Sequence, residues 1–214
     1  MSIYNFLRDI RRKLKLSPIQ QVFRELKRRN VRLKDLHALE IFGGFGDFHT
    51  KDYASQVSTL DVWEIEQKYG RALKRNLPKA EVKITNSYEE IKNTPRKYNL
   101  IVVDNPMSNL GDYCEHFDLF PDIFRVAMEQ TVLILDVIPE INDATLKKYP
   151  YMFNKLQLKC RKSFYKTNHP EKVSFDEMVE VYKNFIITNG FNLEWYFFKK
   201  RSFVYYLVLY IKKL

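Results

Sequence analysis

The sequence predicts a three-layer α/β fold whose seven-stranded, mostly parallel sheet ends in an antiparallel hairpin. Short apolar runs alternate with amphipathic or capped segments from residue 36 onward, which is typical of strands and helices in turn. Polar or glycine-rich residues follow three of these runs, and the last two runs follow each other without a helix between them. Strands that alternate with helices pair in parallel, so the pattern predicts a Rossmann-like sheet covered on both faces.

Two helices are expected before the first strand. Residues 3–16 place apolar side chains on one face and cations on the other, with a period near 3.6. Ser17 and Pro18 then have the form of a helix cap and a first helical residue, and they open a second helix that runs to about Arg29. Residues 1–35 are therefore expected to be a basic helical extension. It either covers the core or contacts an anionic membrane surface or a partner, because basic amphipathic helices do both.

The alternating part of the chain supplies five buried strands. We expect them at residues 38–42, 57–63, 81–85, 99–103 and 131–137. The helices between them are expected at residues 51–54, 65–77, 88–91 and 119–127. The fourth and fifth strands are continuously apolar, which suits central strands that are covered on both faces.

The final third of the chain departs from simple alternation. Residues 139–173 form a long basic stretch with several aromatic residues, and we expect an insertion or lid within a domain that spans residues 36–214. Ser174 and Glu177 have capping-box spacing and predict a helix that ends at Gly190. Residues 192–199 and 202–212 then predict the hairpin.

Composition narrows the choice of compartment and partner. The chain of 214 residues has a net charge of +10, which favours an anionic partner: nucleic acid, a phosphorylated small molecule or acidic lipid. The two cysteines, Cys114 and Cys160, lie far apart and form no Cys-x-x-Cys pair, so neither a disulfide framework nor a zinc knuckle is expected. No apolar run approaches the roughly 20 residues that cross a bilayer, so no transmembrane segment is expected. A cytoplasmic location is the default.

The strand ends carry the residues that suggest a cofactor. Glu40 ends the first strand and precedes a glycine-rich turn that contains Gly43, Gly44 and Gly46. Glu64 ends the second strand about twenty residues later. Glycines let backbone approach a ligand closely, and an acid in this place accepts hydrogen bonds from ribose hydroxyls.

With these residues in place, the chain from Leu36 to Leu214 resembles the class I S-adenosylmethionine-dependent methyltransferases. The resemblance implies S-adenosylmethionine as cofactor, with Glu40 and the three glycines beside it and Glu64 on its ribose. Asn86 and Ser87 follow the third strand, where the family often has an acid near the adenine amino group, and they are carried over as polar contacts. Phe42 departs from the pattern, because it stands where the family has its first glycine.

The fourth strand end carries the candidate catalytic residues. Asp104 begins the run Asp-Asn-Pro-Met. This run matches only in part the Asp-Pro-Pro-Tyr motif that the family uses to methylate amino groups of nucleic acids. Met107 stands in place of the aromatic residue that would stack on a base. For a hydroxyl acceptor the candidate bases are Asp104 and His49, followed by His116. Asp104 is also expected to contact the cofactor. Any of the three can instead have a purely structural role.

Metal binding is not expected. Residues 112–118 contain two aspartates, Cys114 and His116, but their spacing fits no known ligand pattern, and a surface loop gives the same letters. Magnesium-dependent methyltransferases need an Asp-Asn pair after the fifth strand, whereas this chain has Asp136 followed by valine.

The sequence therefore predicts a methyltransferase whose acceptor is unresolved. A saccharide or another small anionic hydroxyl compound is slightly favoured over nucleic acid as the acceptor. A non-catalytic Rossmann-like binding protein is the alternative, and Phe42 supports it. A nicotinamide-dependent oxidoreductase is disfavoured, since residues 43–49 lack the Gly-x-Gly-x-x-Gly spacing.

Overall fold

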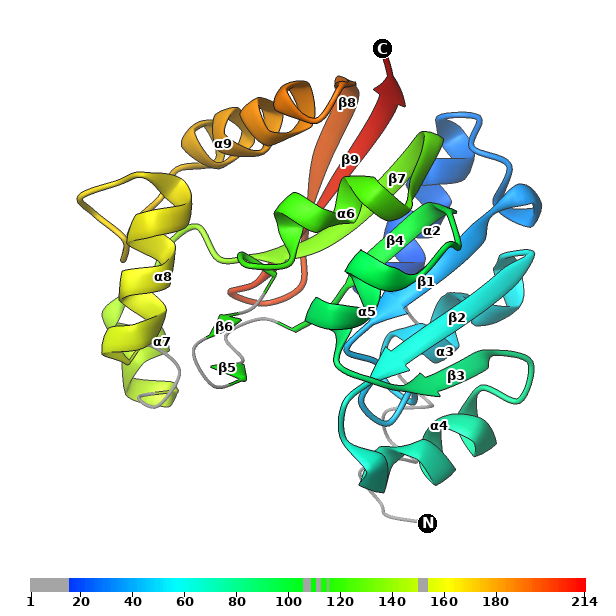
Figure 1. The fold of residues 1–214 in the computed structure, drawn as a ribbon. Coiled ribbons are helices and arrows are strands. Elements are labelled where there is room, and N and C mark those ends of the chain that lie inside the picture. The colour runs from blue at the N-terminus through cyan, green and yellow to red at the C-terminus, as the bar shows by residue number, and fades with distance from the viewer. Residues whose placement is uncertain (1–15, 106–108, 111–112, 115, 150–153) are drawn as a thin grey trace.

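The computed structural model describes residues 16–105, 109–110, 113–114, 116–149 and 154–214. The helix expected over residues 3–16 lies outside this part of the chain except for Leu16, and Met107 lies outside it too. Within it, a sheet of seven strands has the order β3-β2-β1-β4-β7-β9-β8 (Figure 1). The strands are β1 (His37–Ile41), β2 (Thr59–Glu64), β3 (Glu81–Ile84), β4 (Tyr98–Val103), β7 (Ala127–Val137), β8 (Phe191–Lys200) and β9 (Tyr205–Lys213).

The pairing of the strands confirms the predicted fold class. β1 pairs in parallel with β2 and β4, β2 with β3, and β4 with β7. β9 runs antiparallel between β7 and β8, so β8 reaches the sheet only through β9. A separate two-stranded ribbon, β5 (Asn109–Leu110) with β6 (Tyr113–Cys114), follows β4.

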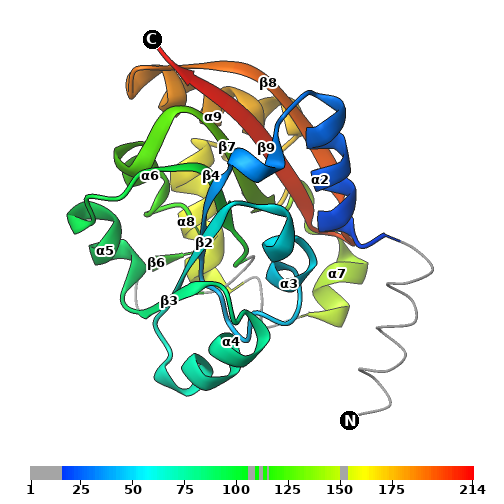
Figure 2. The ribbon, with the colours of Figure 1, turned by 90° about the vertical axis from the view of Figure 1, so that its right-hand side faces the viewer.

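Helices cover both faces of the sheet (Figures 1 and 2). One face packs against α2 (Pro18–Arg28), α3 (Thr50–Tyr53) and α4 (Gly70–Asn76). The other packs against α5 (Ser87–Asn93), α6 (Phe120–Val126), α8 (Lys155–Tyr165) and α9 (Phe175–Thr188), while α7 (Asp143–Lys148) precedes α8. Each face has its own apolar cluster, because successive residues of a strand point to opposite faces.

The second expected helix is α2, and its sequence explains both its start and its position. Ser17 and Gln20 form a capping box around Pro18. The apolar residues of α2 are fully buried against the sheet: Ile19, Val22, Phe23 and Leu26. This helix is therefore part of the core of the domain.

The expected insertion contains α7 and α8. Arg161 of α8 is 1% exposed and donates hydrogen bonds to the carbonyl oxygens of Pro170 (2.6 Å) and Ile138 (2.8 Å). A buried guanidinium that donates to backbone at two places fixes the helix against the chain that leaves β7.

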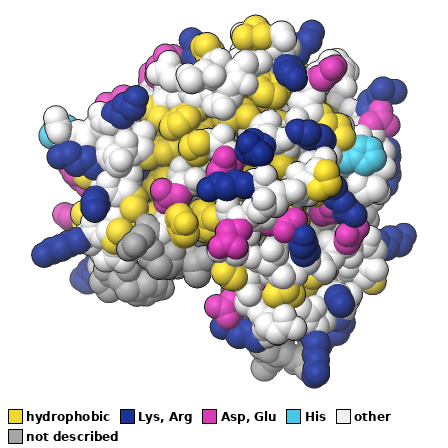
Figure 3. All heavy atoms as spheres, viewed as in Figure 1, with side chains coloured by type: hydrophobic (Ala, Val, Ile, Leu, Met, Phe, Trp, Pro, Cys, Tyr) yellow, Lys and Arg dark blue, Asp and Glu magenta, His cyan; other side chains and the backbone are white. Residues whose placement is uncertain are grey.

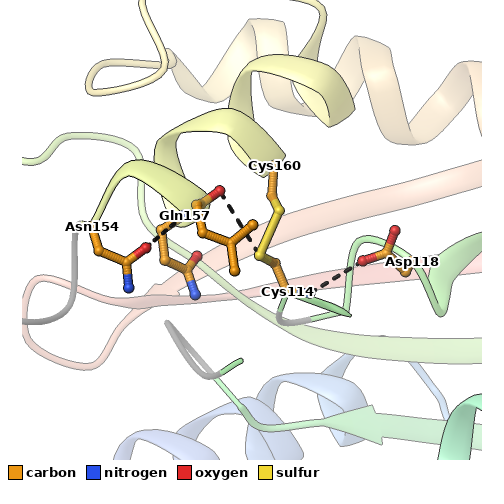
Figure 4. The surroundings of a disulfide bond; sticks show 6 residues. Cys114, Asp118, Asn154, Gln157 and Cys160 are labelled. Carbon is orange, nitrogen blue, oxygen red and sulfur yellow. Dashed lines mark hydrogen bonds between the residues drawn. A yellow bond between two sulfur atoms is a disulfide. The ribbon is translucent and has the colours of Figure 1, made fainter. Parts of the chain in front are cut away.

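The structure corrects the expectation that the cysteines stay apart. Cys114 of β6 and Cys160 of α8 form a disulfide, with their Cα atoms 6.4 Å apart (Figure 4). Their separation of 46 residues concealed the pair in the sequence, because only the packing of α8 beside β6 brings them together. The bond ties the ribbon that follows β4 to the insertion.

Candidate functional site

The turn after β1 has the backbone of a glycine turn even where glycine is missing. Phe42 has φ +66°, and Gly44 and Gly46 have φ +54° and +66°. A positive φ is costly for a bulky residue, so the surrounding structure holds Phe42 in a conformation that glycine adopts freely. The Phe42 ring packs on Tyr88, with ring centroids 5.8 Å apart.

The two central glycines of this turn have different surroundings. A Cβ atom on Gly43 would lie 2.2 Å from Cγ1 of Val62, and the Gly43 amide donates to the carbonyl oxygen of Trp63 (3.0 Å). Gly43 therefore lets the turn lie directly against β2. A Cβ atom on Gly44 would meet no atom within 4 Å, so this part of the turn borders open space.

Glu64 lies beside that open space. Its two carboxylate oxygens accept hydrogen bonds from the amides of Gly44 (2.7 Å) and Glu66 (2.8 Å). Each carboxylate oxygen has further acceptor capacity, so Glu64 can also receive two hydroxyl groups from a ligand. The neighbouring Ile65 is exposed and offers an apolar surface at the same edge of the sheet.

Asn86 and Ser87 follow β3 and differ in their hydrogen bonding. The Asn86 side chain caps α5 by accepting from the Tyr88 amide (3.1 Å). Ser87 is 2% exposed, and its hydroxyl has no hydrogen-bond partner within the described part of the chain. A buried hydroxyl without a partner is uncommon and leaves one polar group for a ligand in this region.

A second group of polar side chains comes from the ends of the central strands. Glu40 and Asp136 lie near the ends of β1 and β7, and Asp104 follows β4. Tyr206 lies near the start of β9, which runs antiparallel to β7 and places Tyr206 opposite Asp136. Their side chains share the face that α2 and α3 cover, because the apolar residues two positions away in each strand belong to that face. All four are largely buried. Tyr53 of α3 donates a hydrogen bond to Glu40.

Arg201, from the turn between β8 and β9, joins these acids. Its Nη1 donates to Oδ1 of Asp104 (2.7 Å) and to Oδ2 of Asp136 (3.0 Å). The guanidinium lies over the Tyr206 ring at 5.6 Å and over the exposed Phe48 ring at 5.3 Å. A residue 97 positions from Asp104 thus completes the site.

His49 belongs to the same group. Its Nε2 lies 3.3 Å from Oδ2 of Asp104, and both side chains are more than nine-tenths buried. The structure therefore brings the two candidate catalytic residues together. His116 lies elsewhere, on the opposite face, where its Nε2 meets the Tyr182 hydroxyl at 2.6 Å. Burial and the Arg161 charge lower the pKa of His116 to about 3, so it is neutral and part of the core.

The acids of this group differ in charge state. Burial raises the pKa of Glu40 to about 8, against the hydrogen bonds from Tyr53 and Thr50. Burial would also raise the pKa of Asp104, but a hydrogen bond with Asp136 and the charges of His49 and Arg201 outweigh burial and lower it. At neutral pH, Glu40 is therefore mostly protonated while Asp104 is ionised.

Some members of the site carried no clear signal in the sequence. Arg201 follows Lys200 in a turn where a basic pair is commonplace, and Tyr53 and Tyr206 look like core aromatics. Asp136 ends its strand as Asp104 does, and that parallel was the available clue. In the described ranges, no group of three or more potential ligands is arranged to hold a metal ion.

Comparison with solved structures identifies the fold. No protein-family model and no curated protein sequence matches the chain. Magnesium protoporphyrin IX methyltransferase from Synechocystis PCC 6803 with bound S-adenosylhomocysteine is similar over 92% of this chain and 82% of its own, with a TM-score of 0.59 and 14% identity.

Two further structures agree. An S-adenosylmethionine-dependent methyltransferase from Methanosarcina mazei is similar over 87% of this chain and 96% of its own (TM-score 0.53, 15% identity). TrmN from Thermus thermophilus is similar over 92% of this chain and 49% of its own (TM-score 0.52, 12% identity). This chain has the class I methyltransferase fold.

Proposed function

We propose that this protein is an S-adenosylmethionine-dependent methyltransferase that acts on a hydroxyl acceptor. The observation that carries the proposal is the pairing of Glu64 with the Gly44 amide beside open space at the edge of the sheet. The similar structure from Synechocystis binds S-adenosylhomocysteine, and another from that source binds S-adenosylmethionine. The residues present fit such a cofactor.

Glu64, Gly44 and Ser87 each have a role in holding the cofactor. Glu64 would accept hydrogen bonds from the two ribose hydroxyls with its remaining lone pairs. Gly44 leaves room for a close approach, and the Ser87 hydroxyl supplies a polar partner. The bound cofactor supplies a methyl group on a positively charged sulfur, which a nucleophile can attack in line.

His49, Asp104 and Arg201 would handle the proton of a hydroxyl acceptor. Arg201 helps to keep Asp104 ionised, so Asp104 itself is a weak base. Histidine as a residue type titrates near neutrality, and His49 lies 3.3 Å from this carboxylate. We assign His49 in its neutral form as the proton acceptor, and Asp104 as the carboxylate that orients it and balances the charge that His49 gains on protonation.

The acceptor class is the finer part of the proposal. We place a saccharide or another small anionic hydroxyl compound first and nucleic acid second. The similar structures act, by their names, on a porphyrin and, for a putative enzyme from Pyrococcus horikoshii, on RNA, so the fold accommodates both classes.

The second candidate is a Rossmann-like binding protein that does not catalyse methyl transfer. Phe42 favours it, because its ring occupies the place of a glycine and packs on Tyr88 beside the turn. The Phe42→Gly substitution distinguishes the two functions. Cofactor binding that appears only in this variant would favour the non-catalytic protein.

Calorimetric titration with S-adenosylmethionine and S-adenosylhomocysteine tests the proposal. We expect micromolar binding by the wild-type protein, which corresponds to about −8 kcal/mol, and at least a tenfold loss in Glu64→Ala. Glu66→Ala is the matched control, because Glu66 is exposed and contributes only its amide to Glu64. Thermal melting of Glu64→Gln separates lost binding from lost folding. Absence of binding by both wild type and Phe42→Gly would refute the proposed cofactor site.

A further inference from the structure

The outer surface of α2 and the loop that follows it collects exposed cations. They are Arg24, Lys27, Arg28, Arg29, Arg32 and Lys34, and we call them the α2 basic surface. Only Glu25 and Asp35 oppose them in this segment: Glu25 pairs with Arg28 (3.6 Å) and Arg29 (3.2 Å), and Asp35 with Arg32 (2.9 Å). Figure 2 shows α2 along the outside of the molecule, whereas on the face in Figure 3 cations and acids are interspersed.

A hollow adjoins these cations. It has a volume of about 750 Å³. Charged, polar and apolar residues line it: Lys27, Arg32, Lys34 and Asp35, then Asn30, Ser55 and Gln56, then Val31 and Leu33. Within the described ranges, the Asn30 side-chain amide makes no hydrogen bond, and Arg24 and Lys27 take part in no ion pair. A hollow of this size is large enough for a small organic group such as a nucleotide.

We propose that the α2 basic surface binds the phosphate backbone of a nucleic acid, with a nucleotide seated in the hollow beside Asn30. Cations release counterions from a polyanion, and an amide can hydrogen-bond a base edge. A lipid surface fits less well, because the apolar residues of α2 are fully buried in the core and none remains to enter a bilayer. The exposed large apolar residues of the described chain also lie outside residues 24–34.

This surface is distinct from the candidate catalytic site. The loop enters β1 at His37, and Glu40 lies toward the opposite end of that strand. Binding at the α2 basic surface therefore does not depend on the proposed methyl transfer. Nucleic-acid binding at this surface can therefore be detected even if the protein does not bind S-adenosylmethionine.

Fluorescence anisotropy with a labelled single-stranded RNA of about 20 nucleotides tests the proposal. Neutralisation of three phosphates predicts a roughly twentyfold loss of affinity between about 50 and 200 mM salt. The triple variant Arg24→Gln, Lys27→Gln, Arg28→Gln should reduce the slope of log affinity against log salt by about two. Asn30→Gly retains the backbone at φ +63° and should weaken binding without a change in slope.

The matched control changes three exposed cations on another helix: Arg71→Gln, Lys74→Gln, Arg75→Gln on α4. We expect this variant to bind RNA as the wild type does. Equal losses in the two triple variants would show an unspecific charge effect and would overturn the proposal.

Two further arms complete the test. DNA of the same sequence shows which nucleic acid the surface prefers, and absence of binding to both at low salt refutes the proposal. Sedimentation with phosphatidylserine vesicles addresses the alternative partner. Vesicle binding that the α2 substitutions abolish, without an effect on RNA, would assign the surface to a membrane instead.

Discussion

Residues at the end of β1 occupy states that are unfavourable in isolation. Glu40 is a carboxyl group at 2% exposure, and Phe42 has a left-handed backbone. Such states cost free energy and persist only where neighbours enforce them, which happens often at functional sites. Tyr53 and the packing on Tyr88 supply that enforcement here.

The pKa of Glu40 predicts a pH-dependent stability. Between its ordinary pKa of 4.5 and its folded pKa of about 8, the folded protein keeps a proton that the unfolded chain loses, so stability falls as pH rises through this window. Glu40→Gln cannot ionise and its oxygen still accepts from Tyr53. We expect equal stability near pH 4 and a gain of a few kcal/mol near pH 8 over wild type, measured by urea unfolding. Glu66→Gln is the exposed control, and a Glu40→Gln effect independent of pH would contradict this assignment.

Substitution by alanine should have different effects at Gly43 and at Gly44. Gly43→Ala should lower stability by about 1–3 kcal/mol, because its Cβ would lie 2.2 Å from Val62 in the core. Gly44→Ala meets no atom, so it should cost only about 1 kcal/mol through its positive φ. Because we propose that Gly44 borders the cofactor, Gly44→Ala should also weaken the binding of S-adenosylhomocysteine. Chemical unfolding and calorimetry of both variants check this, and equal stabilities would show that the contact with Val62 is unimportant.

At the scale of elements, α8 and the β5–β6 ribbon are fastened to each other. The Cys114–Cys160 bond joins them, and the Arg161 hydrogen bonds hold α8 to the chain on either side. The ribbon follows the strand that ends beside Asp104. The disulfide therefore holds α8 to β6 in the part of the chain that follows β4 and Asp104.

The disulfide should contribute measurably to stability. Closing a loop of 46 residues limits the unfolded chain, and loop-closure entropy gives about 4 kcal/mol as the scale of the effect. We expect a reductant to lower the free energy of unfolding of the wild type by about 2–4 kcal/mol. The Cys160→Ser protein is the control, because a reductant should leave it unchanged. A wild type that unfolds identically with and without reductant would contradict the bond.

At the scale of the whole molecule, the sequence predicted the fold better than the site. Apolar alternation and turn residues are local signals, and they placed every strand of the main sheet within a few residues. Glu64 and the glycines could be selected as candidates from the sequence because they follow or end predicted strands. Arg201 and the disulfide could not, since each depends on contacts between segments that only the complete fold brings together.

The place of β9 in the sheet determines what a premature stop codon would remove. β8 touches the sheet only through β9, although β8 comes first along the chain. A chain that ended just before Tyr205 would still contain all of β8, yet that strand would have no neighbour to pair with. Such a truncation would thus remove β9 and release β8 with the turn that follows it, and Asp104 and Asp136 would lose their shared guanidinium.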